Sequence, residues 1–124
     1  MGPMKAIGII FILLNVTLNV ILALAQNVPP SSPALVKLGK ASYAKNCASC
    51  HGNKGDGKGS SAAGLKPPPR NFLAPRWLNG TDLKSLFDMI TNGVPGGAMV
   101  SFSRLPESER WALACYIKSL APSP

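Results

Sequence analysis

The chain opens with an apolar run, after which amphipathic and turn-rich segments alternate. Residues 6–25 hold no charged side chain and follow directly on Lys5. A basic start, an apolar run and small residues such as Ala23 and Ala25 are typical of a secretory signal. The run of about 20 residues is longer than most signal cores and long enough to cross a bilayer. Residues 1–25 are therefore predicted to be a signal peptide or an N-terminal membrane anchor, with the remainder outside the cytoplasm.

A linker and a first helix are predicted next. Residues 26–32 (QNVPPSS) are rich in Pro and Ser and are interpreted as a linker. Ser32 followed by Pro33 is typical of a helix start, because a hydroxyl caps the first turn and Pro suits its first position. Apolar positions recur at helical intervals over 34–50. Gly39 lies inside this predicted helix, where glycine is unfavourable, and indicates the close approach of another helix.

Two loops and two further helices account for the rest of the chain. Residues 52–80 are rich in Gly and Pro and are predicted to form a loop, which is unusually long unless it wraps around something. Thr81 is expected to cap a helix over 81–92, and a second turn-rich loop follows. The last helix is predicted to begin near Pro106, with acidic residues in its first turn. Its apolar stripe consists of Leu113, Tyr116, Ile117 and Leu120.

These patterns predict an all-α domain over residues 33–124, since no segment alternates apolar and polar positions as a half-buried strand would. The 124 residues include 13 Lys and Arg against 5 Asp and Glu, a formal charge of +8, and 46% are hydrophobic. That composition excludes an intrinsically disordered chain. The roughly 100 residues that follow the first segment are few for a self-sufficient core. A cofactor is therefore expected to complete the core.

The string Cys47-Ala-Ser-Cys50-His51 carries the candidate chemistry. A C-x-x-C-H spacing is that of c-type haem attachment. Two Cys three positions apart share one helical face, so both sulfurs can reach the vinyl groups of one porphyrin edge while His51 presents its imidazole to the iron. A C-x-x-C pair also occurs in dithiol redox centres and in zinc sites. This chain has one His, three Cys and no βαβ pattern, which favours one haem c held by two thioethers.

A sixth iron ligand is expected from a methionine. Met89 falls beside the apolar stripe of the 81–92 helix, where a Met is usually core filler. Met99 lies in the second turn-rich loop without an evident packing role, so it is the predicted ligand. The alternative is an open distal site, which would suit ligand binding or peroxidase chemistry.

Together these elements resemble a class I c-type cytochrome of the small bacterial monohaem kind. The resemblance implies a cytochrome c fold, with three main helices and long loops wrapped around one covalently bound haem. It further implies that the first helix crosses the last one near Leu113 and Tyr116. The matching elements are Gly39 and Tyr43, Cys47–Gly52, Gly93–Met99 and Trp111–Leu120.

The resemblance also implies roles for residues in the two loops. A carbonyl of the Pro-Pro-Pro run, with Pro68 favoured, would accept a hydrogen bond from His51. Val100 stands where the family often has Pro after the Met ligand, so a looser loop is expected there.

Three further residues are candidates for functional contacts. Arg70 and Trp77 could donate hydrogen bonds to the haem propionates, because buried carboxylates need partners. Both could equally be ordinary surface residues of a polar loop. Cys115 lies opposite the apolar stripe of the last helix, and it is expected to be a small residue under a loop rather than the site of an intermolecular disulfide.

One-electron transfer is the function that this ligand set predicts. His and Met ligation leaves no position for a substrate, so the protein is expected to be a periplasmic carrier between respiratory redox partners and not an enzyme. Lys54 and Lys58 follow His51 closely, and their charge would suit acidic docking surfaces on those partners. The lysines are scattered without interleaved aromatic residues, which argues against a nucleic-acid site.

Three alternatives remain open for this function, one of which is a dithiol or zinc module without haem. If residues 1–25 are retained, the chain would be a haem c subunit of a respiratory complex, anchored to the inner membrane. If Met99 does not bind the iron, the protein would be a haem peroxidase or ligand-binding protein.

Overall fold

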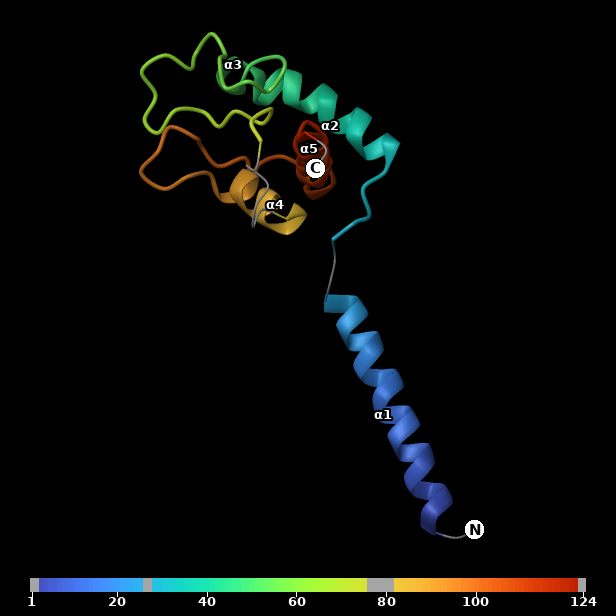
Figure 1. The fold of residues 1–124 in the computed structure, drawn as a ribbon. Coiled ribbons are helices and arrows are strands. Elements are labelled where there is room, and N and C mark those ends of the chain that lie inside the picture. Colours follow the sequence, from blue (N-terminus) through green and yellow to red (C-terminus); the bar gives the residue numbers. More distant parts are fainter. Residues whose placement is uncertain (1–2, 26–27, 76–81, 123–124) are drawn as a thin grey trace.

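The computed structural model describes residues 3–25, 28–75 and 82–122, and no strand occurs within these ranges. In Figure 1, α2 crosses α5, and α4 lies on another side of α5. The segment that follows α3 and the segment between α4 and α5 both extend to the same side of the helices. The all-α prediction is confirmed. The helices are α1 (Pro3–Ala25), α2 (Pro33–Asn46), α3 (Ala48–His51), α4 (Leu83–Asn92) and α5 (Glu107–Ser119).

The helix predicted over 34–50 is divided into α2 and α3 at Cys47. The start is as expected, since Pro33 is the first residue of α2 and the Ser32 side chain accepts a hydrogen bond from the Leu35 amide at 3.3 Å. At Cys47 the backbone leaves the helical region, with φ of −125°. The short α3 follows and carries His51 as its last residue.

The crossing of α2 and α5 depends on Gly39. A Cβ atom on Gly39 would collide with the backbone carbonyl of Ala112 and would lie 2.8 Å from the Cβ of Tyr116. One turn further along α2, the ring of Tyr43 meets the ring of Tyr116 edge to face, with 5.1 Å between centroids. Glycine is thus required by close helix contact, as the sequence indicates, although the residue opposite Gly39 is Ala112 rather than Leu113.

Helix α4 begins two residues later than predicted. Asp82 is its N-cap, and the Asp82 carboxylate accepts a hydrogen bond from the Ser85 amide at 2.7 Å. Thr81, the predicted cap, lies outside the described residues. The buried face of α4 packs on α5, where the ring of Phe87 stacks on Trp111 with 4.0 Å between centroids. The helix ends before Gly93, whose φ of 69° favours glycine.

Helix α5 is buried on all its faces between Trp111 and Ile117, because α2 and α4 both pack on it. Cys115 is 1% exposed and has a free thiol. Cys115 is therefore covered, as expected. The buried surface of this helix was predicted to be one apolar stripe, but it includes every residue from Trp111 to Ile117.

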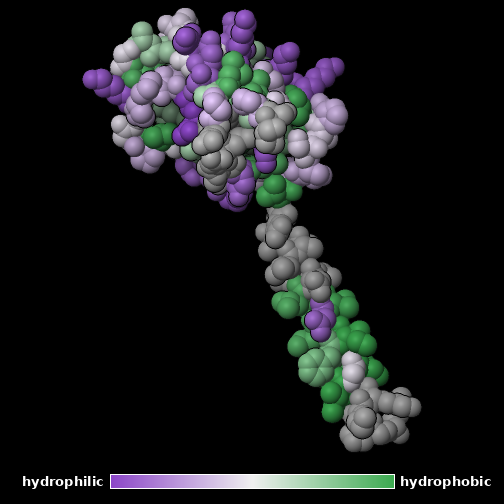
Figure 2. Space-filling model, in the orientation of Figure 1, coloured by the Kyte–Doolittle hydropathy of each residue, from purple (hydrophilic) through white to green (hydrophobic). Residues whose placement is uncertain are grey.

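Helix α1 projects away from the other helices, and Figure 2 shows mostly hydrophobic residues over its coloured part. Its Ile12 and Leu14 side chains are 66% and 65% exposed. No helix in the described ranges combines the length and the apolar composition that a bilayer-spanning segment needs.

Candidate functional site

His51 is held from two directions by the end of the long loop. Its Nδ1 lies 3.2 Å from the carbonyl oxygen of Arg70, and its ring stacks on Phe72 with 4.7 Å between centroids and 15° between planes. Burial lowers the pKa of His51, and the Arg70 charge lowers it further, against the opposing effect of the hydrogen bond. The imidazole is therefore kept in the neutral form that binds metals. With Nδ1 bound to a carbonyl, Nε2 is the nitrogen left for a ligand.

The first part of the loop folds back along α3 and fixes its backbone. The amides of Gly57 and Gly59 donate hydrogen bonds to the carbonyls of His51 and Cys50, at 2.8 and 3.1 Å. The hydroxyl of Tyr43 donates to the carbonyl of Gly52 at 2.8 Å, in a buried position. These bonds satisfy carbonyl groups that a four-residue helix cannot satisfy itself. The position of His51 is thus set by α2, by α3 and by both ends of the loop.

Cys47 and Cys50 are half-buried and face the same cavity as His51. Burial, and next the neighbouring Cys50, raise the pKa of Cys47 to about 12. A dithiol redox centre needs a thiolate, and hence a lowered thiol pKa. The environment of Cys47 does the opposite, so it does not support the dithiol interpretation. In the described ranges, no three His, Cys, Asp or Glu side chains gather that could hold a metal ion by themselves.

A cavity of about 920 Å³ lies between α3, the two loops and the inner faces of α4 and α5. The volume falls in the range of ligand pockets, and most of the lining is apolar. The charged residues in its wall are all cations: Lys45, Arg70 and Arg104. The apolar and sulfur-containing walls are made by Leu65, Phe72, Leu86, Met89, Ile90, Val94, Met99, Phe102 and Ile117, among others. An apolar chamber with two thiols, one imidazole and cations for carboxylates fits a haem.

Both candidate methionines line this cavity, from different elements. Met99 comes from the loop after α4, is half-buried and packs against the hydrophobic core. Met89 comes from α4 and is 40% exposed, so the expectation that it fills the core is wrong. The reason is that α4 turns its Leu86 and Ile90 positions to the core and leaves Met89 at the edge of the cavity.

The prediction that a Pro68 carbonyl bonds to His51 is wrong. The carbonyl against His51 belongs to Arg70, whereas Pro68 lines the cavity two residues earlier. The Phe72 amide donates to the Gly55 carbonyl at 2.7 Å, and this bond sets which part of the loop passes the imidazole. Trp77 lies outside the described residues.

The cations of the wall are not those singled out from the sequence, apart from Arg70. Lys54 and Lys58 are exposed, but neither lines the cavity, because the turn that holds them folds back along α3. Lys45 and Arg104 were not identified from the sequence, and neither was Phe72. Phe72 could have been found, since it is a large aromatic residue in a polar, Pro-rich segment. Nothing in the sequence singles out Lys45 or Arg104.

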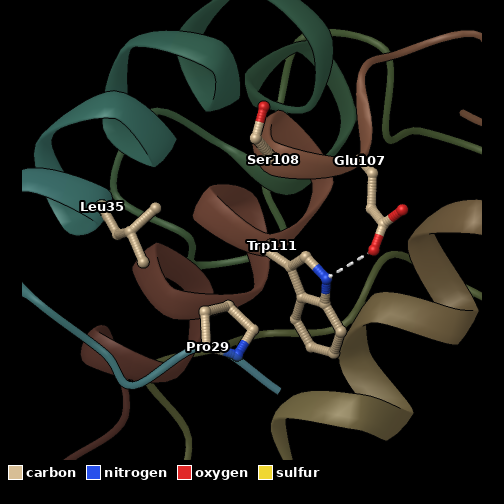
Figure 3. A pocket seen from close by; sticks show the side chains of 5 residues that line it. All are labelled: Pro29, Leu35, Glu107, Ser108 and Trp111. Carbon is tan, nitrogen blue, oxygen red and sulfur yellow. Dashed lines mark hydrogen bonds between the residues drawn. The ribbon is translucent and has the colours of Figure 1, made fainter. Parts of the chain in front are cut away.

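A second hollow, of about 350 Å³, lies between the start of α2 and the first turn of α5. It shares no lining residue with the large cavity. In Figure 3 the indole of Trp111 forms its floor and donates a hydrogen bond from Nε1 to Glu107 at 3.3 Å. Its lining residues are Pro29, Leu35, Glu107, Ser108 and Trp111.

The helical fold and the C-x-x-C-H cavity together define a haem c protein. The sequence matches the family described as cytochrome c over residues 36–121, and the chain belongs to that family. Membership implies a covalently bound haem c, and Cys47 and Cys50 fit the attachment motif of such proteins.

Curated relatives include subunits of respiratory oxidases. The chain is 33% identical over 97 residues to the Cbb3-type cytochrome c oxidase subunit CcoP of Azospirillum brasilense, covering 78% of this chain and 32% of that protein. It is 36% identical over 99 residues to subunit FixP of Azorhizobium caulinodans, covering 79% and 31%. The chain thus spans about a third of the length of these relatives.

A solved structure shares the fold. A chain of the reducing HAO-like protein complex of Kuenenia stuttgartiensis superposes with a TM-score of 0.62 at 29% identity. The match covers 77% of this chain and 45% of that one.

Proposed function

We propose that residues 33–124 form a domain that carries one haem c, attached through Cys47 and Cys50, and transfers single electrons. In this proposal His51 Nε2 and the Met99 sulfur would hold the iron. The observation that carries the proposal is that both thiols, the imidazole and Met99 line the same cavity. The haem supplies a reversible ferric–ferrous couple, and His and Met ligation favours the ferrous state relative to two His ligands.

The chain's own residues determine how that couple behaves. The Arg70 carbonyl and the Phe72 ring hold the His51 imidazole in place, and the apolar wall keeps water from the iron. The side chains of Lys45, Arg70 and Arg104 offer positive charge to the two haem carboxylates. With His51 and Met99 as the residues that would hold the iron, no place would remain for a substrate, so the domain would work as a carrier and not as an enzyme.

Export from the cytoplasm belongs to the same proposal. Lys5 is the only charged side chain in residues 1–25, and an uncharged apolar run follows it. We therefore infer an export segment that ends near Ala25 and a linker over 26–32. The haem domain then works in the periplasm or at the outer face of the inner membrane. Its partners are other respiratory redox proteins with acidic docking surfaces, which the positive charge of the domain would attract.

A second candidate function is that of a haem c subunit within a respiratory complex. It is favoured by the similarity to the oxidase subunits CcoP and FixP. The haem chemistry is the same in both cases, and the difference lies in whether residues 1–25 are retained. A peroxidase or ligand-binding role would require an open site in place of Met99.

Expression in a host that attaches haem c, followed by intact mass, tests these proposals together. We expect the mass of the chain plus one haem, less residues 1–25. A mass with residues 1–25 retained, in protein recovered with membranes, would favour the anchored subunit. Voltammetry should show one reversible one-electron wave, and ferric protein should bind cyanide or imidazole slowly. No covalent haem, or a second one, would contradict the proposal.

A further inference from the structure

The loop that carries Met99 is closed at its base by hydrogen bonds. We refer to residues 93–102 as the Met99 loop. Phe102 donates from its amide to the carbonyl of Ile90 at 3.0 Å, and the Ser101 hydroxyl donates to the carbonyl of Thr91 at 2.6 Å. Inside the loop, the amide of Val94 donates to the carbonyl of Met99 at 3.0 Å. The end of α4 and the return of the loop therefore lie side by side.

Arg110 of α5 connects the two sides of this base from outside the loop. Its Nη1 donates to the hydroxyl of Thr91 at 2.5 Å, and its Nε donates to the carbonyl of Leu105 at 3.1 Å. Its guanidinium carbon lies 4.8 Å from the centre of the Phe87 ring. Thr91 precedes the Met99 loop and Leu105 follows it. A single half-buried side chain thus joins the chain just before the loop to the chain just after it.

The guanidinium is suited to this position in a way that an ammonium is not. Its donors are coplanar and point in fixed directions, and the plane can lie on an aromatic ring. Here the two bonds go to a hydroxyl and a carbonyl, so their value lies in geometry rather than in charge pairing. The rest of Arg110 is fixed as well, because α5 is the most buried helix of the domain.

Apart from hydrogen bonds from the Val94 amide to Met99 and from the Gly97 amide to Val94, the Met99 loop has few internal constraints to replace such a clamp. It contains Gly93, Gly96 and Gly97, and Gly96 has a φ of 74° with no atom near its missing Cβ. Val100, which follows Met99, is 60% exposed and lacks the ring by which a proline would fix the backbone. The position of the Met99 sulfur is therefore set by how well the base of the loop is held.

We propose that Arg110 is a positioning residue, which clamps the base of the Met99 loop and so keeps the Met99 sulfur in the cavity. The inference rests on the proposed function, in which Met99 is an iron ligand. When the clamp is weakened, the loop opens more often while the helices stay folded. The sulfur is then replaced more readily by a competing ligand from solution.

Imidazole binding to the ferric holoprotein measures this opening. The apparent affinity for imidazole rises with the fraction of molecules in which the loop is open. Because Lys cannot make both hydrogen bonds of the guanidinium, we expect Arg110→Lys to bind imidazole about tenfold or more tightly than the parent. Far-UV circular dichroism without denaturant should show the parental helix content, because the helices stay folded while the loop opens.

Two further variants make the comparison specific. Thr91→Val removes one acceptor of the clamp, keeps the shape of the side chain and leaves Arg110 in place, so it should raise imidazole affinity in the same direction. In the double variant, the change in imidazole-binding free energy should be smaller than the sum of the changes in the two single variants. Glu107→Gln is the matched control, because it alters a polar contact of α5 to Trp111 and does not touch the loop. Its imidazole affinity should remain parental.

The outcomes distinguish a failure of the clamp from a failure of the proposed function on which it rests. Parental imidazole affinity in both Arg110→Lys and Thr91→Val would overturn the clamp, as would equal increases in these variants and in Glu107→Gln. If instead Met99→Ala binds imidazole as weakly as the parent does, Met99 is not the displaced ligand and the proposed function fails. If Arg110→Lys does not fold, the imidazole affinity of Thr91→Val decides: an increase supports the clamp, and a parental value overturns it.

Discussion

The imidazole of His51 and the phenyl ring of Phe72 lie face to face, with 4.7 Å between their centroids. Phe72 is buried, and its backbone amide is bonded to the Gly55 carbonyl. The residue that closes the long loop is therefore also the residue that packs on the His51 imidazole. The loop is folded around the histidine, as well as around the cavity.

We expect Phe72→Ala to destabilise the holoprotein by about 3–5 kcal/mol, because a buried aromatic side chain is lost and the imidazole is left without its packing partner. Chemical unfolding followed by tryptophan fluorescence would measure the loss. Phe72→Leu retains most of the apolar volume and should lose less than half as much. Equal stability of the parent and Phe72→Ala would show that the ring does not support the site.

The hydroxyl of Tyr43 offers a test of a single buried hydrogen bond. Tyr43→Phe leaves the Gly52 carbonyl without its donor, so we expect a loss of about 1–3 kcal/mol in the free energy of unfolding. Tyr116→Phe is the control, since it preserves the edge-to-face contact of the two rings. A larger loss in Tyr116→Phe than in Tyr43→Phe would contradict the role assigned to the bond. Denaturant titrations of both variants would decide.

The helices could be predicted from the sequence because their signals are local. The capping residues Ser32 and Pro33 and the apolar spacing of α5 act within a few positions of one another. Gly39 carried longer-range information, since only a close helix contact explains a glycine there. The motif from Cys47 to His51 identified the site for the same reason, as its two Cys and its His lie within five consecutive positions.

What the sequence could not supply were contacts between distant segments. Arg70 is the residue against His51 because of a hydrogen bond between Phe72 and Gly55, which no local pattern encodes. The start of α4 was misplaced because Thr81 and Asp82 are both good caps, and only the geometry of the Asp82–Ser85 bond separates them. Arg110 was not singled out, because an arginine on a helix is ordinarily a surface residue.

The two methionines of the cavity can be separated by spectroscopy. Ferric protein should show the weak long-wavelength absorption band of a sulfur–iron bond, and Met99→Ala should abolish it and lower the reduction potential. Met89→Ala should retain the band, because Met89 lies at the exposed edge of the cavity. Loss of the band in Met89→Ala, with retention in Met99→Ala, would reverse the assignment.

Asp82 should give α4 a pH-dependent contribution to stability. The hydrogen bond from the Ser85 amide lowers the pKa of Asp82 below its usual value. A carboxyl whose pKa is lowered on folding stabilises the native state at neutral pH, and this contribution is lost as the pH falls through the folded-state pKa, which lies below the usual aspartate value. We therefore expect Asp82→Ala to lower the Tm at neutral pH, with the difference shrinking toward about pH 3. Asp82→Asn keeps an uncharged cap, and its Tm should change less with acid than that of the parent. A constant difference between parent and Asp82→Ala across this range would contradict the linkage.

Docking of a redox partner should depend on the cations at the cavity rather than on those nearest His51 in sequence. Lys45 and Arg104 are exposed and line the cavity wall, whereas Lys54 and Lys58 do not line it. Electrostatic steering raises association rates by about 10–10³-fold, and salt screens it over a Debye length of about 10 Å at 0.1 M. We expect Lys45→Glu with Arg104→Glu to slow electron transfer from a small anionic reductant at low salt and to flatten its dependence on ionic strength.

The matched control for this test is Lys37→Glu with Lys118→Glu, which makes the same change in net charge at exposed positions away from the cavity. If steering is local, the control pair should change the rate much less than the cavity pair. With a small cationic reagent, the cavity pair should raise the rate instead of lowering it. Equal effects of the two pairs would mean that only the net charge of the domain matters. In that case the attraction is spread over the whole domain, and the cavity rim has no special role in attracting a partner. If neither pair changes the rate, the positive charge serves solubility.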